Sequence, residues 1–188
     1  MPLFRSFLLA ALVTAALPAA IAQATQVIPL DTRGLVRSSN DIVIGEVIAT
    51  RSYWNPEGTR ILTDVSVRVS ETLRGAEGTI TLTQLGGEVD GAIYDVPGSP
   101  AFRRGEQALL FLWRDTRGRA QVNGMAQGKF DITRDAASGA RTVQRPLPGL
   151  GFRDPRSLSA LRAGERAPAV PLADMVTEVK RLITEGGR

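Results

Sequence analysis

The stretch from Ile61 to Ser70 (ILTDVSVRVS) carries the clearest pattern in the chain. Its odd positions are β-branched, namely Ile61, Thr63, Val65, Val67 and Val69, and its even positions are mostly polar. Strict alternation is the period of a β-strand with one face in the core and the other in water. A helix would scatter the same side chains around its circumference. The stretch therefore predicts a long, half-buried antiparallel strand, with Val65 and Val67 inward and Asp64, Ser66 and Arg68 outward.

Other strand patterns lie on both sides of this stretch. In Asp41 to Thr50 (DIVIGEVIAT), Ile42 and Ile44 share one face and Val43 and Val47 the other, so its first half is expected to be buried on both sides. Further strands are predicted at Thr79–Leu85 (Ile80 and Leu82 inward), Gln107–Arg114 (buried on both faces), Arg119–Asn123 and Gly128–Arg134. These patterns predict a mainly β domain over residues 23–145, a barrel or sandwich of five to seven strands.

The composition changes after Arg145. Residues 146–170 are rich in Pro and Gly and show little periodicity, which is typical of a linker. Residues 171–185 then carry one apolar stripe at helical spacing, made of Leu172, Met175, Val176, Val179, Leu182 and Ile183. We expect a C-terminal amphipathic helix that docks on the barrel.

The N-terminus has the pattern of an export signal. Arg5 precedes an apolar run from Phe7 to Leu17, and small residues with two A-x-A frames follow Pro18. The run is too short to span a bilayer, which needs about 20 apolar residues. Residues 1–22 are therefore predicted to be a signal peptide, with cleavage after Ala22 or Ala24. The mature protein is expected in the periplasm or outside the cell, without stable insertion in a membrane.

Two residue types are missing from the whole chain: it has no Cys and no His. This excludes disulfides, His-dependent catalytic triads, and zinc sites built from Cys or His. The 23 Lys and Arg residues exceed the 19 Asp and Glu residues only slightly, and the arginines are scattered rather than clustered. Together with the absence of an aromatic stacking face, this argues against nucleic acid as a partner. No cofactor and no metal are expected.

Several turn and strand features between residues 38 and 134 recur in a known order. They are Trp54, Gly58, Ile61-x-Thr63-x-Val65-x-Val67-x-Val69, Leu73-Arg74-Gly75, Gly86-Gly87, Phe102-x-x-Gly105-Glu106-x-x-Leu109-Leu110-Phe111-Leu112 and Gln127-Gly128-Lys129-Phe130. In these features the chain resembles a family of uncharacterised exported bacterial proteins, a resemblance that implies no activity.

The order of these elements also resembles, more distantly, the OB-fold module of tissue inhibitors of metalloproteinases and netrin-like domains. That resemblance implies a small Greek-key, OB-like barrel. It does not carry the inhibitory mechanism across, because those inhibitors chelate the protease zinc through an N-terminal cysteine and this chain has no cysteine.

Two loops supply the candidate binding residues. Tyr53, Trp54 and Asn55 bring two large aromatics to a turn between strands, and Tyr and Trp are favoured binding anchors. The alternative is that Trp54 folds back and plugs the barrel end. Glu88, Asp90 and Asp95 place three carboxylates on a glycine-rich loop, which suits either a solvated acidic turn or a loose Ca²⁺ site.

Two other motifs have a structural interpretation. Gly124-Met-Ala-Gln-Gly128-Lys129 has too few residues between its glycines for a phosphate loop, so it predicts a tight turn with Lys129 outward and Phe130 in the core. Glu106 is expected to accept backbone N–H bonds at a turn.

These observations favour a non-catalytic exported binding module. Its partner would be an envelope or extracellular protein, peptide or glycan, or a co-secreted protease that it modulates. Two alternatives stay open. One is a small hydrolase that uses two carboxylates among Glu46, Asp64, Glu71, Glu88 and Glu106, and the other is a structural component of the envelope.

Overall fold

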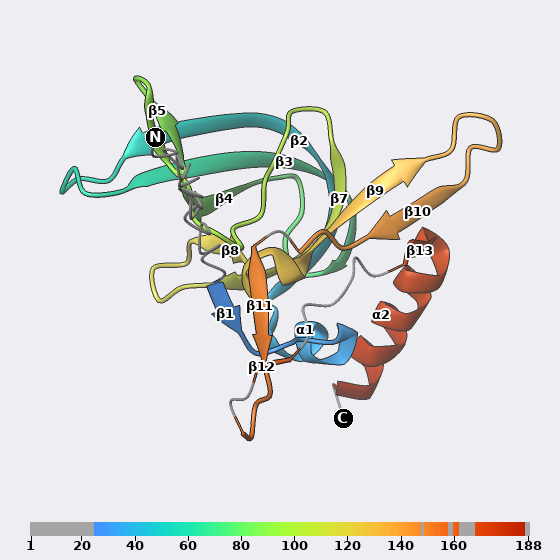
Figure 1. Ribbon diagram of the computed structural model, residues 1–188. Helices are drawn as coiled ribbons and strands as arrows, with labels where there is room; N and C mark the ends of the chain where they lie inside the picture. Colours follow the sequence, from blue (N-terminus) through green and yellow to red (C-terminus); the bar gives the residue numbers. More distant parts are fainter. Residues whose placement is uncertain (1–24, 148, 158–159, 162–167, 187–188) are drawn as a thin grey trace, which may run out of the picture.

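A computed structural model describes residues 25–147, 149–157, 160–161 and 168–186 (Figure 1). The predicted signal peptide lies outside the described residues. Five strands close into a barrel: β2 (Asp41–Trp54), β3 (Ile61–Arg74), β4 (Thr79–Leu85), β8 (Ala120–Val122) and β7 (Gln107–Arg114), in the order β2-β3-β4-β8-β7. All pairings around the barrel are antiparallel except β4 with β8. The fold is a small OB-like barrel, which confirms the predicted fold class.

One edge of β7 pairs with β2, and the opposite edge pairs with two different strands. Its first half pairs with β9 (Lys129–Arg134), and its second half pairs with β8. Beyond β9 the sheet continues through β10 (Arg141–Gln144) to β13 (Val170–Pro171), so that the β9–β10 hairpin projects away from the barrel (Figure 1). A 3-10 helix, η1 (Met125–Gly128), joins β8 to β9. Gly128 is required there, because a Cβ would lie 2.5 Å from the backbone oxygen of Asn123.

Two apolar cores lie on opposite faces of β2 and β7. The barrel interior contains Val43 and Val47 of β2 with Val65, Val67 and other aliphatic side chains. The outer face of the same strands packs Ile42, Ile44, Leu109 and Phe111 against the helices. Burial on both faces is therefore confirmed for the first half of β2 and for Ala108–Leu112 of β7, whereas Trp113 at the end of β7 is exposed. The inward direction of Val65 and Val67 is confirmed as well.

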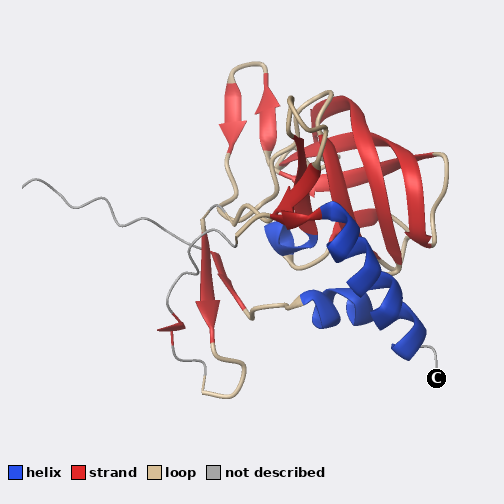
Figure 2. Cartoon of the chain, turned by 90° about the vertical axis from the view of Figure 1, so that its right-hand side faces the viewer, coloured by secondary structure: helices blue, strands red, loops and turns tan. Residues whose placement is uncertain are grey.

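Two helices cover the outer face. They are α1 (Thr32–Ser38), which buries Leu35 and Val36, and α2 (Leu172–Gly186), which buries Leu172, Val179 and Leu182. Figure 2 shows them side by side on one side of the barrel. The predicted C-terminal helix is confirmed, and its apolar stripe packs into this core. Among the described residues, no helix has the length and apolar character needed to cross a membrane.

Two small sheets were not predicted from the sequence. A hairpin of β5 (Gly87–Val89) and β6 (Ala92–Tyr94) occupies the segment that the sequence predicts to be a glycine-rich loop. The second sheet joins β1 (Thr25–Val27), β11 (Leu150–Arg153) and β12 (Ala160–Leu161), so the predicted linker contains strands. Leu150 and Phe152 of β11 are buried against Ala126, and two apolar side chains are too few to reveal such a strand in a Pro- and Gly-rich segment.

Candidate functional site

A pocket of about 340 Å³ opens at one end of the barrel. Its walls come from β2 and β3, from the end of β4, from β6 and from the loop between β6 and β7. The lining residues are Thr50, Ser52, Thr63, Val65, Gln84, Leu85, Gly86, Gly87, Tyr94, Asp95, Val96, Ser99, Pro100, Ala101 and Phe102. Polar groups make up a large part of this list, in contrast to the aliphatic interior of the barrel below. We name this cavity the mouth pocket.

A bulge in β2 places hydroxyl groups in the mouth pocket. The β2–β3 register shifts between Val47 and Ala49, after which Thr50 pairs with Val65 and Ser52 with Thr63. Cross-strand partners in a sheet point to the same face, and Val65 belongs to the barrel interior. The side chains of Thr50 and Ser52 therefore continue the inward-facing row, with hydroxyls where the first half of the strand has valines.

These hydroxyls bind one another and the rim. Ser52 and Thr63 are joined by a hydrogen bond of 2.8 Å between Oγ and Oγ1, and Thr63 Oγ1 donates to the backbone oxygen of Gly86 over 2.6 Å. The chain passes close above them at Gly87. A Cβ at Gly87 would lie 2.4 Å from Thr63 Oγ1, and its φ of +141° is a conformation that favours glycine.

The outer wall of the mouth pocket is fixed by the rest of the fold. Ser99 Oγ donates to the backbone oxygen of Leu85 over 3.0 Å, and the backbone N–H of Ala126 donates to Gly98 O over 2.9 Å. A Cβ at Gly98 would lie 2.3 Å from Leu150 Cδ2. Strand β11 thus packs directly on the loop that walls the pocket, which gives this small sheet a role in shaping the site.

Gln84 is the least satisfied polar side chain of the mouth pocket. It follows Ile80 and Leu82 on the inward-facing side of β4 and is only 9% exposed. Its Nε2 is buried and has no hydrogen-bond partner among the described residues. An unpaired buried amide is destabilising by about 1–3 kcal/mol, so its presence needs an explanation. Gln84 is one of the residues that line the mouth pocket.

The aromatic candidates do not form one site. Trp54 is 43% exposed, is in none of the buried clusters and shares a face with Ser52, so it does not plug the barrel as a buried side chain. Tyr53 points to the opposite face, where its hydroxyl donates to Asp64 Oδ1 over 3.1 Å and Thr83 donates to the same oxygen over 2.8 Å. Burial, and next the charge of Asp64, raise the pKa of Tyr53.

Asn55 has a structural task. Its Oδ1 accepts hydrogen bonds of 2.8 Å from the backbone N–H groups of both Thr59 and Arg60, and its Nδ2 donates to Glu57 over 2.6 Å. The side chain thereby closes the turn between β2 and β3. The hydrogen-bonding groups of this binding candidate are therefore used within its own loop, the loop that follows Trp54.

The three acidic candidates are divided between the hairpin and the pocket. Glu88 lies on β5 and is exposed, and Asp90 lies in the tight turn, where it and Gly91 have φ values of 50° and 79°. Asp95 lines the mouth pocket. No group of three or more Asp and Glu side chains in the described part of the chain is placed to hold a metal ion.

Lys129 differs from the prediction that it points outward. It is 3% exposed, with Nζ hydrogen bonded to Asp131, 3.1 Å from Glu106 Oε1 and 5.1 Å from the centre of the Phe102 ring. The prediction was wrong because the loop before β7 folds over this face of β9 and covers the side chain. Glu106 faces this ammonium group at ion-pair distance, without hydrogen-bond geometry at Oε1.

No known family model and no curated protein matches the chain.

Proposed function

We propose that the protein is an exported, non-catalytic binding module that holds an extended peptide at the mouth pocket. The observation that carries this proposal is Gln84, whose buried amide has no partner inside a pocket lined by hydroxyls. A peptide carbonyl or a polar side chain that enters the pocket would supply the missing acceptor. The unpaired amide is then explained as a binding group rather than as a defect of the core.

The β5–β6 hairpin supports a peptide as the ligand. In the described part of the chain β5 and β6 pair only with each other, so the outer edge of β6 offers backbone groups to an added strand. Tyr94 and Asp95, at the end of β6, line the mouth pocket, so an added strand along this edge would run past the pocket entrance. The hairpin also carries Ile93, which is 74% exposed. Trp54, in the adjacent part of β2, adds a second exposed apolar anchor.

The same pocket argues against a two-carboxylate hydrolase at this position. Asp95 is the only carboxyl group among the lining residues, whereas glycoside hydrolysis of the ordinary kind needs two that face each other. Glu46, Glu71 and Glu106 are each paired with a cation elsewhere.

A glycan is the second candidate, and Trp54 is the observation that favours it. An exposed aromatic ring beside a row of hydroxyl groups is also the arrangement on which a sugar ring would stack. This alternative predicts binding that depends on Trp54 but not on the free edge of the hairpin.

The test is a binding screen of the purified protein against a peptide library and a glycan array. Hits are then measured by calorimetry with Trp54→Ala and Gln84→Met. We expect peptide hits, and a dissociation constant at least tenfold weaker in both variants. Trp113→Ala is the matched control, because Trp113 has a similar exposure of 37% but lies on β7, which contributes none of the pocket's lining residues, whereas Trp54 lies on β2, which contributes Thr50 and Ser52. Equal affinities of the Trp54→Ala and Trp113→Ala variants would contradict the proposal.

A further inference from the structure

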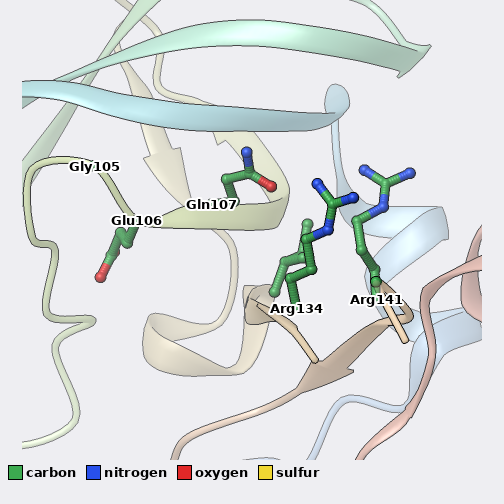
Figure 3. Close-up of a pocket in the computed structure, with 7 residues that line it drawn as sticks. Gly105, Glu106, Gln107, Arg134 and Arg141 are labelled. Carbon is green, nitrogen blue, oxygen red and sulfur yellow. The ribbon is translucent and has the colours of Figure 1, made fainter. Parts of the chain in front are cut away.

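A second and larger pocket, of about 560 Å³, lies between the start of β7 and the β9–β10 hairpin. Its lining residues are Gly105, Glu106, Gln107, Ile132, Arg134, Gly139 and Arg141. Figure 3 shows the side chains of Arg134 and Arg141 side by side, with both guanidinium groups directed to the same region. The amide oxygen of Gln107 is directed toward that side, while the carboxylate of Glu106 points away.

The sheet forces the two arginines together. Arg134 of β9 and Arg141 of β10 are direct cross-strand partners. The backbone N–H of Asp135 donates to Ala140 O, so the next pair along the ladder is of the non-hydrogen-bonded type, in which side chains come closest. Like charges directly opposite each other in a sheet are destabilising. This hairpin would therefore be more stable with an anion between the two groups.

No described residue supplies that anion. Neither guanidinium makes an ion pair or a hydrogen bond with another residue in the described part of the chain. The acidic side chains nearby already have partners: Glu46 binds Arg68, Glu71 binds Lys180, Glu106 and Asp131 bind Lys129, and Asp135 accepts hydrogen bonds within its own turn. The described part of the chain leaves the two positive charges of the pocket uncompensated.

We propose that Arg134 and Arg141 bind a dianionic phosphoryl group. Two guanidinium groups present two planar forks of N–H donors, and arginine forks match phosphate oxygens in pairs. A carboxylate has only two oxygens and one charge, so it would occupy one fork and leave the other unpaired. A phosphoryl dianion offers three oxygens and two charges, which matches the two forks and their two positive charges. Free phosphate and a phosphomonoester on a larger ligand share this chemistry.

Calorimetric titration with inorganic phosphate, at ionic strength matched with chloride, tests the proposal. We expect one binding event per chain, and we expect the dissociation constant to be at least tenfold larger in both Arg134→Gln and Arg141→Gln. Arg117→Gln, in the exposed β7–β8 turn, makes the same change in net charge outside the pocket and should bind as the unmodified protein does. A parallel titration with glucose 6-phosphate separates the two sources of the group. Tighter binding than phosphate indicates a ligand-borne phosphoryl group, and equal or weaker binding indicates phosphate itself.

A second measurement is independent of ligand binding. In low-salt buffer without phosphate, Arg141→Gln should raise the melting temperature because it removes the like-charge contact. Added phosphate should raise the melting temperature of the unmodified protein and leave that of Arg141→Gln unchanged. Equal phosphate effects on the unmodified protein, Arg141→Gln and Arg117→Gln would show general charge screening only and would overturn the proposal. So would the absence of a binding event.

Discussion

The two halves of β2 differ in burial and in the side chains that they carry. From Asp41 to Val47 every side chain but that of Glu46 is buried, because the barrel interior covers one face and the helices cover the other. From Ile48 to Trp54 no side chain is fully buried. Here the helices no longer cover the outer face, and hydroxyl groups replace valines on the inner face. The bulge between Val47 and Ala49 marks the boundary.

The first half of β2 contributes to stability, and the second half contributes to the proposed binding site. We name Asp41–Val47 the closed half, because its side chains contribute to both apolar cores. We name Ile48–Trp54 the open half, because it contributes Thr50 and Ser52 to the mouth pocket and carries the exposed Trp54. Substitutions in the closed half should therefore unfold the protein, whereas substitutions in the open half should change binding or ionisation with smaller effects on stability.

The largest effect is expected from Val67→Asp, opposite Val47 in the closed half. Val67 is fully buried in the barrel, so the new carboxylate would lie in the core without a partner. The loss should be several kcal/mol, enough to unfold a domain of ordinary stability. Ser66→Asp is the control, because Ser66 is on the outer face and only partly buried; its loss should stay below about 1 kcal/mol. Equal shifts of the two melting temperatures would mean that the register of β3 is wrong.

A smaller loss is expected when the buried Lys129 is removed. Lys129→Ala deletes a packed side chain and leaves Glu106 and Asp131 without their cation, at a loss of about 2 to 3 kcal/mol. Lys180→Ala breaks an exposed pair with Glu71 and should lose less than about 1 kcal/mol. Urea unfolding of both variants measures the difference. If the two variants lose the same free energy of unfolding, the burial of Lys129 does not contribute to stability, and the prediction is contradicted.

A still smaller effect on stability is expected from the ionisation of Tyr53, which lies on the outer face of the open half. Its raised pKa means that the folded protein holds the phenolic proton more tightly than the unfolded chain. The corresponding stability is present at neutral pH and is lost as the pH rises through the folded pKa. Absorbance titration should place Tyr53 above an ordinary tyrosine, and Asp64→Asn should lower its pKa. An unchanged titration in Asp64→Asn would contradict the contact.

The smallest effect concerns metals. Since the described part of the chain brings no three acidic side chains together, EDTA is expected to leave the melting temperature unchanged. A large loss restored by Ca²⁺ would direct attention back to Glu88, Asp90 and Asp95.

The sequence predicts the closed half well and the site poorly, for physical reasons. Val65 and Val67, like Ile42 and Ile44, are apolar side chains two residues apart, and this period shows directly which face of each strand is apolar. Lys129 follows the same period, yet it is buried because a loop distant in sequence covers its face. Such coverage cannot be deduced from local spacing.

The mouth pocket lies between these cases. Gln84 follows Ile80 and Leu82 at the same spacing, so an inward amide could have been predicted from the strand pattern. Its neighbours in the pocket could not, because the bulge in β2 and the loop that carries Ser99 bring them there. The arginine pair likewise depends on the register of a hairpin, which is fixed by its turn rather than by either strand.

Urea unfolding of Gln84→Met tests the central claim most directly, because the claim is that the open half keeps an unpaired polar group for a ligand. Methionine is close to glutamine in volume and has no amide to leave unpaired. The free energy of unfolding should rise by about 1 kcal/mol, while binding of the peptide ligand weakens at least tenfold. A variant that is less stable than the unmodified protein and binds the peptide equally well would show that Gln84 belongs to the core, and would contradict the account.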